Sequence, residues 1–191
     1  MSMRPTSPTI RRAIFVDRDG TLNPDLHYLA DGERIELYPG VGEAIRLAHS
    51  HGFLVVCVTN QSGVERGYYT TEDVERMHTR LNALLHREGT QIDGFYFCPH
   101  TPEHGCACRK PGTELFERAA RDFSIDLRTS AIIGDRVIDL QAGHRLSLVS
   151  VLVPSPGHET ETAKDVQAQA AHPEIQGSTF LIAMCRLLAR G

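Results

Sequence analysis

The sequence predicts an α/β fold: a doubly wound, Rossmann-like parallel sheet with helices on both faces. Short apolar runs rich in β-branched residues alternate with longer segments of helical periodicity, which is the pattern of βαβ units. Each run is almost continuously apolar, as expected for strands that are covered on both faces. The predicted strands are residues 13–16, 53–58, 94–97, 130–134 and 148–153.

Helices are predicted between these strands, at residues 40–51, 70–88, 113–123 and 138–146. The second of them begins with T-T-E-D at Thr70, which is a capping signal. A last amphipathic stretch, residues 178–190, predicts a helix that docks on the sheet. The Pro-, Gly- and Thr-rich segment 154–162 indicates a loop or an excursion at the edge of the sheet.

The bulk properties are those of one globular domain. The chain has 191 residues, 41% of them hydrophobic and 23% charged, and both fractions are near globular averages. We therefore expect a single domain over residues 11–191, preceded by a flexible leader at residues 1–10. The formal net charge of −4 gives no general attraction to nucleic acid or to an anionic membrane, so neither is expected as a partner.

We expect neither a membrane-spanning segment nor a secretory signal peptide in this sequence. The longest apolar run, residues 53–58, is far too short to span a bilayer, and the N-terminal MSMRPTSPTIRR lacks the apolar core of a signal peptide. We expect a cytoplasmic protein that acts as a monomer. In that compartment thiols stay reduced, so clustered cysteines are more often metal ligands than disulfides.

Polar residues suited to a phosphate or a metal follow four of the predicted strands. In a doubly wound sheet the chemistry lies at the carboxyl ends of the strands. The residues that follow those ends are DRDGT (17–21), TNQSG (59–63), a Cys/His cluster with an Arg-Lys pair (98–110) and GDRVID (134–139). We therefore expect one functional site at this edge of the sheet.

Asp17 and Asp19 lie two residues apart where the first strand ends. In extended chain, residues i and i+2 point to the same side, so both carboxylates can face one pocket. Paired carboxylates repel unless a hard cation such as Mg²⁺ lies between them, and Asp135 would supply a further oxygen ligand. The alternative is a plain surface turn, for which Asp-x-Asp-Gly is also suited.

The cluster near the middle of the chain has the pattern C-x-H-x5-C-x-C. Three thiolates and one imidazole suit tetrahedral Zn²⁺, and a site without an open position is structural rather than catalytic. Zinc would fix the backbone of the loop and thereby the directions of Arg109 and Lys110. The alternatives are redox or incidental cysteines and a solvated basic pair. The four candidate ligands are Cys98, His100, Cys106 and Cys108.

As a set, the strand-end motifs resemble those of the haloacid dehalogenase-like phosphohydrolases, over roughly residues 13 to 153. The resemblance implies a Mg²⁺-dependent phosphomonoesterase. Asp17 would be the nucleophile that forms an aspartyl phosphate, and Asp19 would be first the acid for the leaving oxygen and then the base for water. The implied magnesium ligands are Asp17, Asp19 and Asp135.

Further residues would bind the phosphoryl group and the rest of the substrate. Thr59 would bind the transferring phosphoryl group, Asn60 would help to position it, and Lys110 would neutralise its charge. Arg109, a rigid bidentate donor, would grip another part of the substrate, such as a second phosphate. The candidate binding residues are Thr59, Asn60, Gln61, Ser62, Arg109, Lys110, Asp25, Leu26, His27 and Tyr28.

The combination of DRDGTLN, TNQSGVERGYYT, CPH…CACRKP and GDRVID looks like a narrower group, the D-glycero-D-manno-heptose 1,7-bisphosphate 7-phosphatases and the related histidinol-phosphatases. It implies removal of the 7-phosphate of the heptose bisphosphate, with histidinol phosphate or another small sugar phosphate as the alternative. In this group the loop at 25–28 lines the substrate pocket. Arg136 stands where relatives often have lysine. Too few residues separate DRDGTLN from the second strand to form a large cap domain.

Two other classes are compatible with parts of this pattern. A phosphoaccepting receiver module shares an α/β fold, a strand-end aspartate and Mg²⁺, but a general base two residues from the acceptor would hydrolyse its phosphoryl group. A DNA-end phosphatase is disfavoured by the net charge of −4 and by the lack of a basic stripe with aromatic residues.

Overall fold

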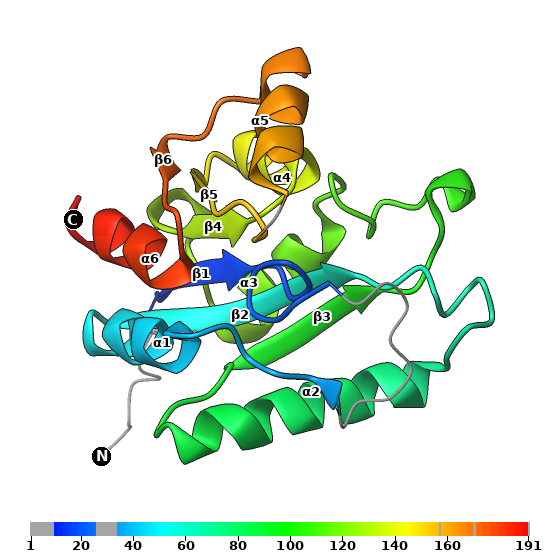
Figure 1. The fold of residues 1–191 in the computed structure, drawn as a ribbon, viewed down its shortest axis with the longest axis horizontal. Coiled ribbons are helices and arrows are strands. Elements are labelled where there is room, and N and C mark those ends of the chain that lie inside the picture. The colour runs from blue at the N-terminus through cyan, green and yellow to red at the C-terminus, as the bar shows by residue number, and fades with distance from the viewer. Residues whose placement is uncertain (1–9, 26–33, 157, 170, 191) are drawn as a thin grey trace, which may run out of the picture.

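The computed structural model describes residues 10–25, 34–156, 158–169 and 171–190. Within these ranges a six-stranded parallel sheet forms the centre, in the order β3-β2-β1-β4-β5-β6 (Figure 1). The strands are β1 Arg12–Val16, β2 Phe53–Asn60, β3 Gly94–Cys98, β4 Ala131–Gly134, β5 Val149–Leu152 and β6 Ile175–Gln176. The order reverses between β1 and β4, and ligands bind beside such a switch point in doubly wound sheets.

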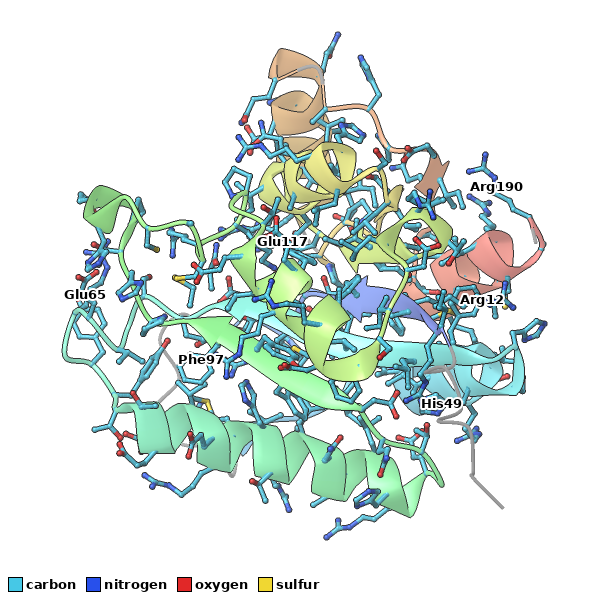
Figure 2. All side chains as sticks on the ribbon, turned by 180° about the vertical axis from the view of Figure 1, so that it is seen from behind. Arg12, His49, Glu65, Phe97, Glu117 and Arg190 are labelled. Atoms are coloured by element: carbon cyan, nitrogen blue, oxygen red, sulfur yellow. The ribbon has the colours of Figure 1, made fainter. Side chains whose placement is uncertain are left out.

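Helices cover both faces of the sheet, as predicted. Helices α1 (Val41–Ser50), α2 (Thr71–Arg87) and α6 (Phe180–Leu188) pack on one face. Helices α3 (Glu114–Phe123) and α4 (Val137–Leu146) pack on the other, where Figure 2 shows α3 in front of the strands. Helix α5 (Glu159–Ala168) lies against α4 and β5.

Strand β1 shows why the predicted strands are continuously apolar. Its side chains alternate between two core clusters: Ile14 and Val16 face α1 and α6, and Ala13 and Phe15 face α3. Phe15 meets Phe116 of α3 edge to face at 5.1 Å between ring centroids. With both faces buried there is no polar side for a period-two pattern to reveal.

The predicted helices are present with ends shifted by one or two residues. The capping signal at Thr70 is confirmed, because Thr70 Oγ1 accepts from the Asp73 backbone N–H at 3.2 Å while Asp73 Oδ2 accepts from the Thr70 backbone N–H at 2.7 Å. This capping box satisfies two amides that would otherwise lack intrahelical partners.

The prediction of a loop at 154–162 is wrong from Glu159 onward, where α5 begins, and β6 was not predicted. Among the side chains of α5 that the structure describes, Val166 alone joins the apolar cluster shared with α4 and β5. A helix with so little apolar periodicity is stabilised by its neighbours rather than by its own sequence. Strand β6 has two residues, too few for any pattern.

Three further predictions concern the N-terminal leader, a large cap domain and membrane-spanning segments. The predicted leader lies outside the described residues apart from Ile10, which is exposed. The described residues between β1 and α1 form turns and short loops, with no large cap. None of the described helices has the length and apolarity that crossing a bilayer requires.

His78 is a buried histidine of α2 that makes stability depend on pH. Its ring stacks on Phe95 of β3 at 4.4 Å between centroids, and its Nε2 has no hydrogen-bond partner among the described residues. Burial, helped by the nearby Arg18 cation, lowers the pKa of His78 from 6.5 to about 3. The unfolded chain therefore binds this proton more readily than the folded one, and stability falls as the pH drops below 6.5.

We predict that His78→Phe, which keeps the stacked ring but cannot be protonated, gains stability relative to wild type on acidification. Between pH 8 and pH 5 the relative gain should be about 2 kcal/mol, from 1.36 kcal/mol per pKa unit. Urea unfolding of both proteins at the two pH values measures it. An equal difference between the two proteins at both pH values would contradict the buried neutral histidine.

Candidate active site

A cavity of about 190 Å³ opens at the carboxyl ends of β1 and β2. Most of the predicted catalytic and binding residues line it: Asp17, Asp19, Asp25, Thr59, Asn60, Gln61, Ser62, Arg109 and Lys110. Residues that were not predicted also line it: Arg18, Pro24, Ile35, Tyr69, Arg136 and Ile138. Leu26, His27 and Tyr28 lie outside the described residues.

The DRDGT turn places Asp17 at the floor of this cavity. The Asp17 backbone N–H donates to the Ile133 carbonyl of β4 at 3.0 Å, which extends the pairing of β1 with β4. Gly20 then turns the chain with a φ of 82°, and a Cβ there would lie 2.3 Å from Asp135 Oδ2. The glycine thus allows the turn to close directly against Asp135. Asp17 is buried, which rules out a plain surface turn.

Lys110 is almost fully buried and its ammonium joins three elements. Its Nζ lies 2.8 Å from Asp17 Oδ1 and 2.7 Å from Asp139 Oδ1 of α4, and it donates to the Val58 carbonyl of β2 at 2.7 Å. Burial opposes the charge, but Asp139 and Asp17 raise the pKa of Lys110 above its ordinary value. The lysine is therefore a fixed cation beside Asp17.

Asn60 fixes the backbone of Lys110. Its Nδ2 donates to the Lys110 carbonyl at 3.2 Å, and its Oδ1 accepts from the Lys110 backbone N–H at 3.0 Å. Both ends of the amide are thus engaged with one residue. Asn60 was predicted to position the phosphoryl group; that role stays a prediction, and these contacts position Lys110.

Asp17, Asp135 and Asp139 form a buried acidic group in which one oxygen from each carboxylate lies within 4.8 Å of the other two. Burial raises the pKa of Asp17 to about 6 despite the Lys110 cation. Burial, with repulsion from the other two carboxylates, raises the pKa of Asp135 to about 8. Three carboxylates face one ammonium, and a divalent cation with a preference for oxygen ligands would balance the excess negative charge.

The carboxylate of Asp19 lies outside this group and faces donors instead. It accepts from Arg18 Nη2 at 2.8 Å, Asn23 Nδ2 at 3.0 Å and Gln61 Nε2 at 2.8 Å. Burial alone would raise the pKa of Asp19, but the Arg18 guanidinium and these hydrogen bonds lower it below its ordinary value. These donors therefore favour the ionised form of Asp19. Its predicted role as a magnesium ligand stays a prediction.

Gln61 is held by its own neighbours rather than free for a ligand. Its Nε2 also donates to Thr59 Oγ1 at 2.9 Å, and its Oε1 accepts from the Tyr69 hydroxyl at 2.8 Å. The amide therefore orients Asp19 and Thr59 together. Sequence analysis did not single out Tyr69 or Arg18, although both lie inside the quoted motifs.

Asp139 was likewise missed as a site residue. It is completely buried in the first turn of α4. Gly134 makes this possible, because a Cβ there would lie 2.3 Å from Asp139 Cγ. The spacing G-D-x-x-x-D was a usable signal, since a second carboxylate four residues after Asp135 falls on the helix N-terminus beside the same strand end.

The four predicted zinc ligands come together. The sulfur of Cys98 lies 3.6 Å from both Cys106 Sγ and His100 Nδ1, and the sulfur of Cys108 lies 3.2 to 3.3 Å from the other three ligand atoms. These cysteines are free, since a disulfide needs about 2.05 Å. Zn–S bonds of about 2.3 Å place tetrahedral sulfurs about 3.8 Å apart, so the cluster fits such an ion.

Arg109 is anchored to the loop that carries these ligands. Its Nη1 donates to the carbonyl of His100 at 3.0 Å. It lines the first cavity and also an adjoining hollow of about 400 Å³ that reaches α5. Arg136 borders both spaces, and His158 at the start of α5 borders the second. The unpredicted helix therefore forms the outer wall of the site.

Known proteins resemble this chain in sequence and in structure. The HAD-hydrolase-like family model matches residues 107–176. Over 133 residues the chain is 44% identical to a D-glycero-beta-D-manno-heptose-1,7-bisphosphate 7-phosphatase of Helicobacter pylori, covering 69% of this chain and 77% of that one. The chain belongs to the heptose-bisphosphate phosphatase family. It is a phosphoric monoester hydrolase of the haloacid dehalogenase-like type.

Two further relatives cover more of the chain. A D-glycero-alpha-D-manno-heptose-1,7-bisphosphate 7-phosphatase of Burkholderia mallei is 35% identical over 169 residues, covering 85% of this chain and 89% of that one. The crystal structure of the D,D-heptose 1,7-bisphosphate phosphatase from B. bronchiseptica, complexed with magnesium and phosphate, matches with a TM-score of 0.82 at 31% identity, covering 94% of this chain and 99% of that one.

Replacing Asp139 tests the role of the buried ion pair. In Asp139→Asn the ammonium of Lys110 loses one carboxylate and meets an amide that can donate toward it. We predict a fall in kcat of about tenfold or more and a loss of roughly 1–3 kcal/mol in the free energy of unfolding. Steady-state kinetics and urea unfolding measure both. Asp122→Asn, at an exposed carboxylate of α3, is the matched control, and wild-type kcat in Asp139→Asn would refute the assignment.

Proposed function

We propose that this protein removes the 7-phosphate of D-glycero-D-manno-heptose 1,7-bisphosphate in a Mg²⁺-dependent reaction. The observation that carries the proposal is the buried pair of Asp17 and Lys110, 2.8 Å apart on the floor of a cavity at the switch point of the sheet. A carboxylate beside a fixed cation suits nucleophilic attack on a phosphate ester. The names of the relatives supply the substrate class.

The reaction proceeds in two displacements. In the first, an oxygen of Asp17 bonds to phosphorus, the bond from phosphorus to the sugar oxygen breaks, and Asp19 gives its proton to that oxygen. In the second, water bonds to phosphorus, Asp19 takes a proton from it, and the bond to Asp17 breaks to release inorganic phosphate. Lys110 stays beside the phosphoryl oxygens in both steps and neutralises their charge.

Asp19 must change protonation between the resting state and the first displacement. Its bonds to Arg18, Asn23 and Gln61 favour the ionised form. A phosphate dianion placed in the cavity adds negative charge beside it and shifts its pKa back toward that of an acid. The same donors restore the base once the sugar has left, which is the form that the second displacement needs.

Magnesium supplies charge neutralisation at the phosphoryl oxygens when it is bound. Asp17 and Asp135 would hold it, with Asp19 as the third proposed ligand. Asp139 belongs to the same acidic group but is turned to Lys110 at 2.7 Å. Asp17 also contacts Lys110 through Oδ1 at 2.8 Å, so it would serve both the lysine and the ion, while Asp135 would serve the ion and Asp139 the lysine.

The remote phosphate of the substrate would lie in the hollow beside the first cavity. Arg109 and Arg136 border both spaces, so a sugar between them can have one phosphate at Asp17 and the other at the guanidinium groups. Bidentate arginine contacts suit a phosphate monoester. Asp25 borders the same passage and can accept from sugar hydroxyls.

The substrate is tested with purified protein and Mg²⁺ against both anomers of the heptose bisphosphate and against histidinol phosphate. We predict a higher kcat/KM for a heptose bisphosphate, because only that ester offers a second phosphate to the arginines. Asp17→Asn should have no measurable turnover while its thermal unfolding stays cooperative. Equal kcat/KM for histidinol phosphate would overturn the substrate, and residual activity near wild type in Asp17→Asn would overturn the nucleophile.

The Cys/His cluster would hold a structural zinc ion, which leaves no coordination position for a substrate. Its reduced thiols suit a cytoplasmic protein. We predict that Cys106→Ser binds less than one equivalent of zinc, unfolds at a lower temperature and has a higher KM, because the loop that anchors Arg109 loses its metal. Metal analysis with thermal unfolding and kinetics measures these effects. Wild-type KM in a zinc-free Cys106→Ser protein would argue against a role for the metal in binding.

A further inference from the structure

The loop after β2, residues 61–69, lies against the loop of the Cys/His cluster, residues 98–110. Two backbone hydrogen bonds join them: the Gln61 N–H donates to the Cys98 carbonyl at 2.7 Å, and the Glu65 N–H donates to the Pro99 carbonyl at 3.2 Å. The first loop directly follows Thr59 and Asn60, which are predicted to bind the phosphoryl group, and the second carries Arg109. Whatever fixes their contact therefore affects the substrate site.

The side chain of Glu65 makes a further contact between the loops. One carboxylate oxygen accepts from the backbone N–H of Thr101, and the other lies 2.6 Å from Nδ1 of His104. Figure 2 shows Glu65 at the outer edge of the molecule, beside the turn that carries this histidine. The short 3-10 helix Pro102–His104 is thus held at both of its ends.

His104 connects the carboxylate of Glu65 to His100, which is a candidate metal ligand. Its ring stacks on the ring of His100 at 3.9 Å between centroids and 13° between planes. His100 uses Nδ1 toward the sulfurs and its backbone carbonyl toward Arg109 Nη1. A displacement of His104 would therefore act on the metal cluster and on Arg109 together.

Lys110 is independent of this contact, although it follows Arg109 in the chain. Its ammonium is held by Asp17, Asp139 and the Val58 carbonyl, and its backbone is held by Asn60. Val58 and Asn60 belong to β2, Asp139 belongs to α4, and Asp17 directly follows β1. Only Arg109 takes its anchor from the cluster loop.

We propose that Glu65 is a positioning residue for substrate recognition: its carboxylate clamps the cluster loop through Thr101 and His104 and so fixes Arg109, while Lys110 and the chemical step stay unaffected. The proposal rests on the proposed function, because Arg109 is taken to grip the remote phosphate. Groups that orient a metal-ligating histidine typically contribute tenfold or more to metal affinity.

An ordinary surface ion pair would behave differently. Exposed pairs contribute little on average, because water and salt screen them. Arg66 and Glu103, from the same two loops, form such a pair at 4.0 Å with the Glu103 side chain 76% exposed. Glu103 accepts from its own backbone amide and from the Thr101 side chain, within one turn of its own loop. Glu65 differs from it in accepting the Thr101 backbone amide from the other loop and in bearing on a stacked histidine. Glu103→Gln is therefore the matched control.

The experiment compares the zinc-loaded wild type with Glu65→Ala, Glu65→Gln and Glu103→Gln. Zinc release to a chromophoric chelator is measured first, without substrate. We expect release from Glu65→Ala to be about tenfold faster than from wild type. Glu65→Gln should recover part of the loss, because its amide oxygen still accepts from Thr101, and Glu103→Gln should match wild type.

Kinetics then separate recognition from chemistry. In Glu65→Ala, KM for the heptose bisphosphate should rise while kcat stays within about twofold of wild type. KM for p-nitrophenyl phosphate, which has no second phosphate for Arg109, should not change. Wild-type zinc release in Glu65→Ala, or a fall in kcat at unchanged KM, would overturn the clamp. If wild type hydrolyses neither ester, the proposed function fails, and zinc release alone decides the clamp.

Discussion

The ammonium of Lys110, buried between Asp17 and Asp139, is the interaction on which the site depends. A lysine with 2% of its surface exposed remains charged only if its desolvation is repaid by close partners. Two carboxylates and a carbonyl from three elements provide them. The ends of β1 and β2 and the start of α4 are thereby fixed to one another, and Asp17, the proposed nucleophile, is fixed beside a cation.

In this arrangement the buried acidic group keeps an excess of negative charge. Lys110 contacts Asp17 and Asp139. Burial and the neighbouring carboxylates raise the pKa of Asp135 to about 8. A site that binds both a divalent cation and a phosphate dianion needs such an imbalance, because each charged ligand compensates the other. Asp19 is the exception, since Arg18 neutralises it and keeps it apart from the acidic group. Asp17 and Asp19, two residues apart in the chain, thus have different electrostatic environments and can take different roles.

Features that depend on a local sequence pattern could be predicted. Strand β1 could be predicted because both of its faces are buried, and the approach of Asp17 to Asp135 followed from the rule that strand ends converge. The gathering of the four Cys/His side chains needed only residue type and spacing. Helix α5 could not be predicted, since Val166 is the one described side chain of this helix in its apolar cluster. The contacts of Asp139 and Asn60 with Lys110 join segments twenty-nine and fifty residues apart, and no local pattern contains such contacts.

The two cations of the Arg-Lys pair also turned out to be fixed differently. Sequence analysis expected zinc to direct both of them. The structure anchors Lys110 in the sheet and α4, and it anchors only Arg109 on the loop of the metal ligands. Recognition of the substrate and the chemical step can therefore vary separately within one short segment.

The central claim is that Asp17 itself becomes phosphorylated. The most direct measurement is rapid quenching of Asp19→Asn after mixing with p-nitrophenyl phosphate, whose leaving group needs no acid, followed by mass spectrometry of the peptides. A burst of nitrophenolate equal to the amount of protein, with the phosphoryl group on Asp17, is the result that we predict. A phosphoryl group on another residue, or no burst and no phosphorylated peptide, would contradict it.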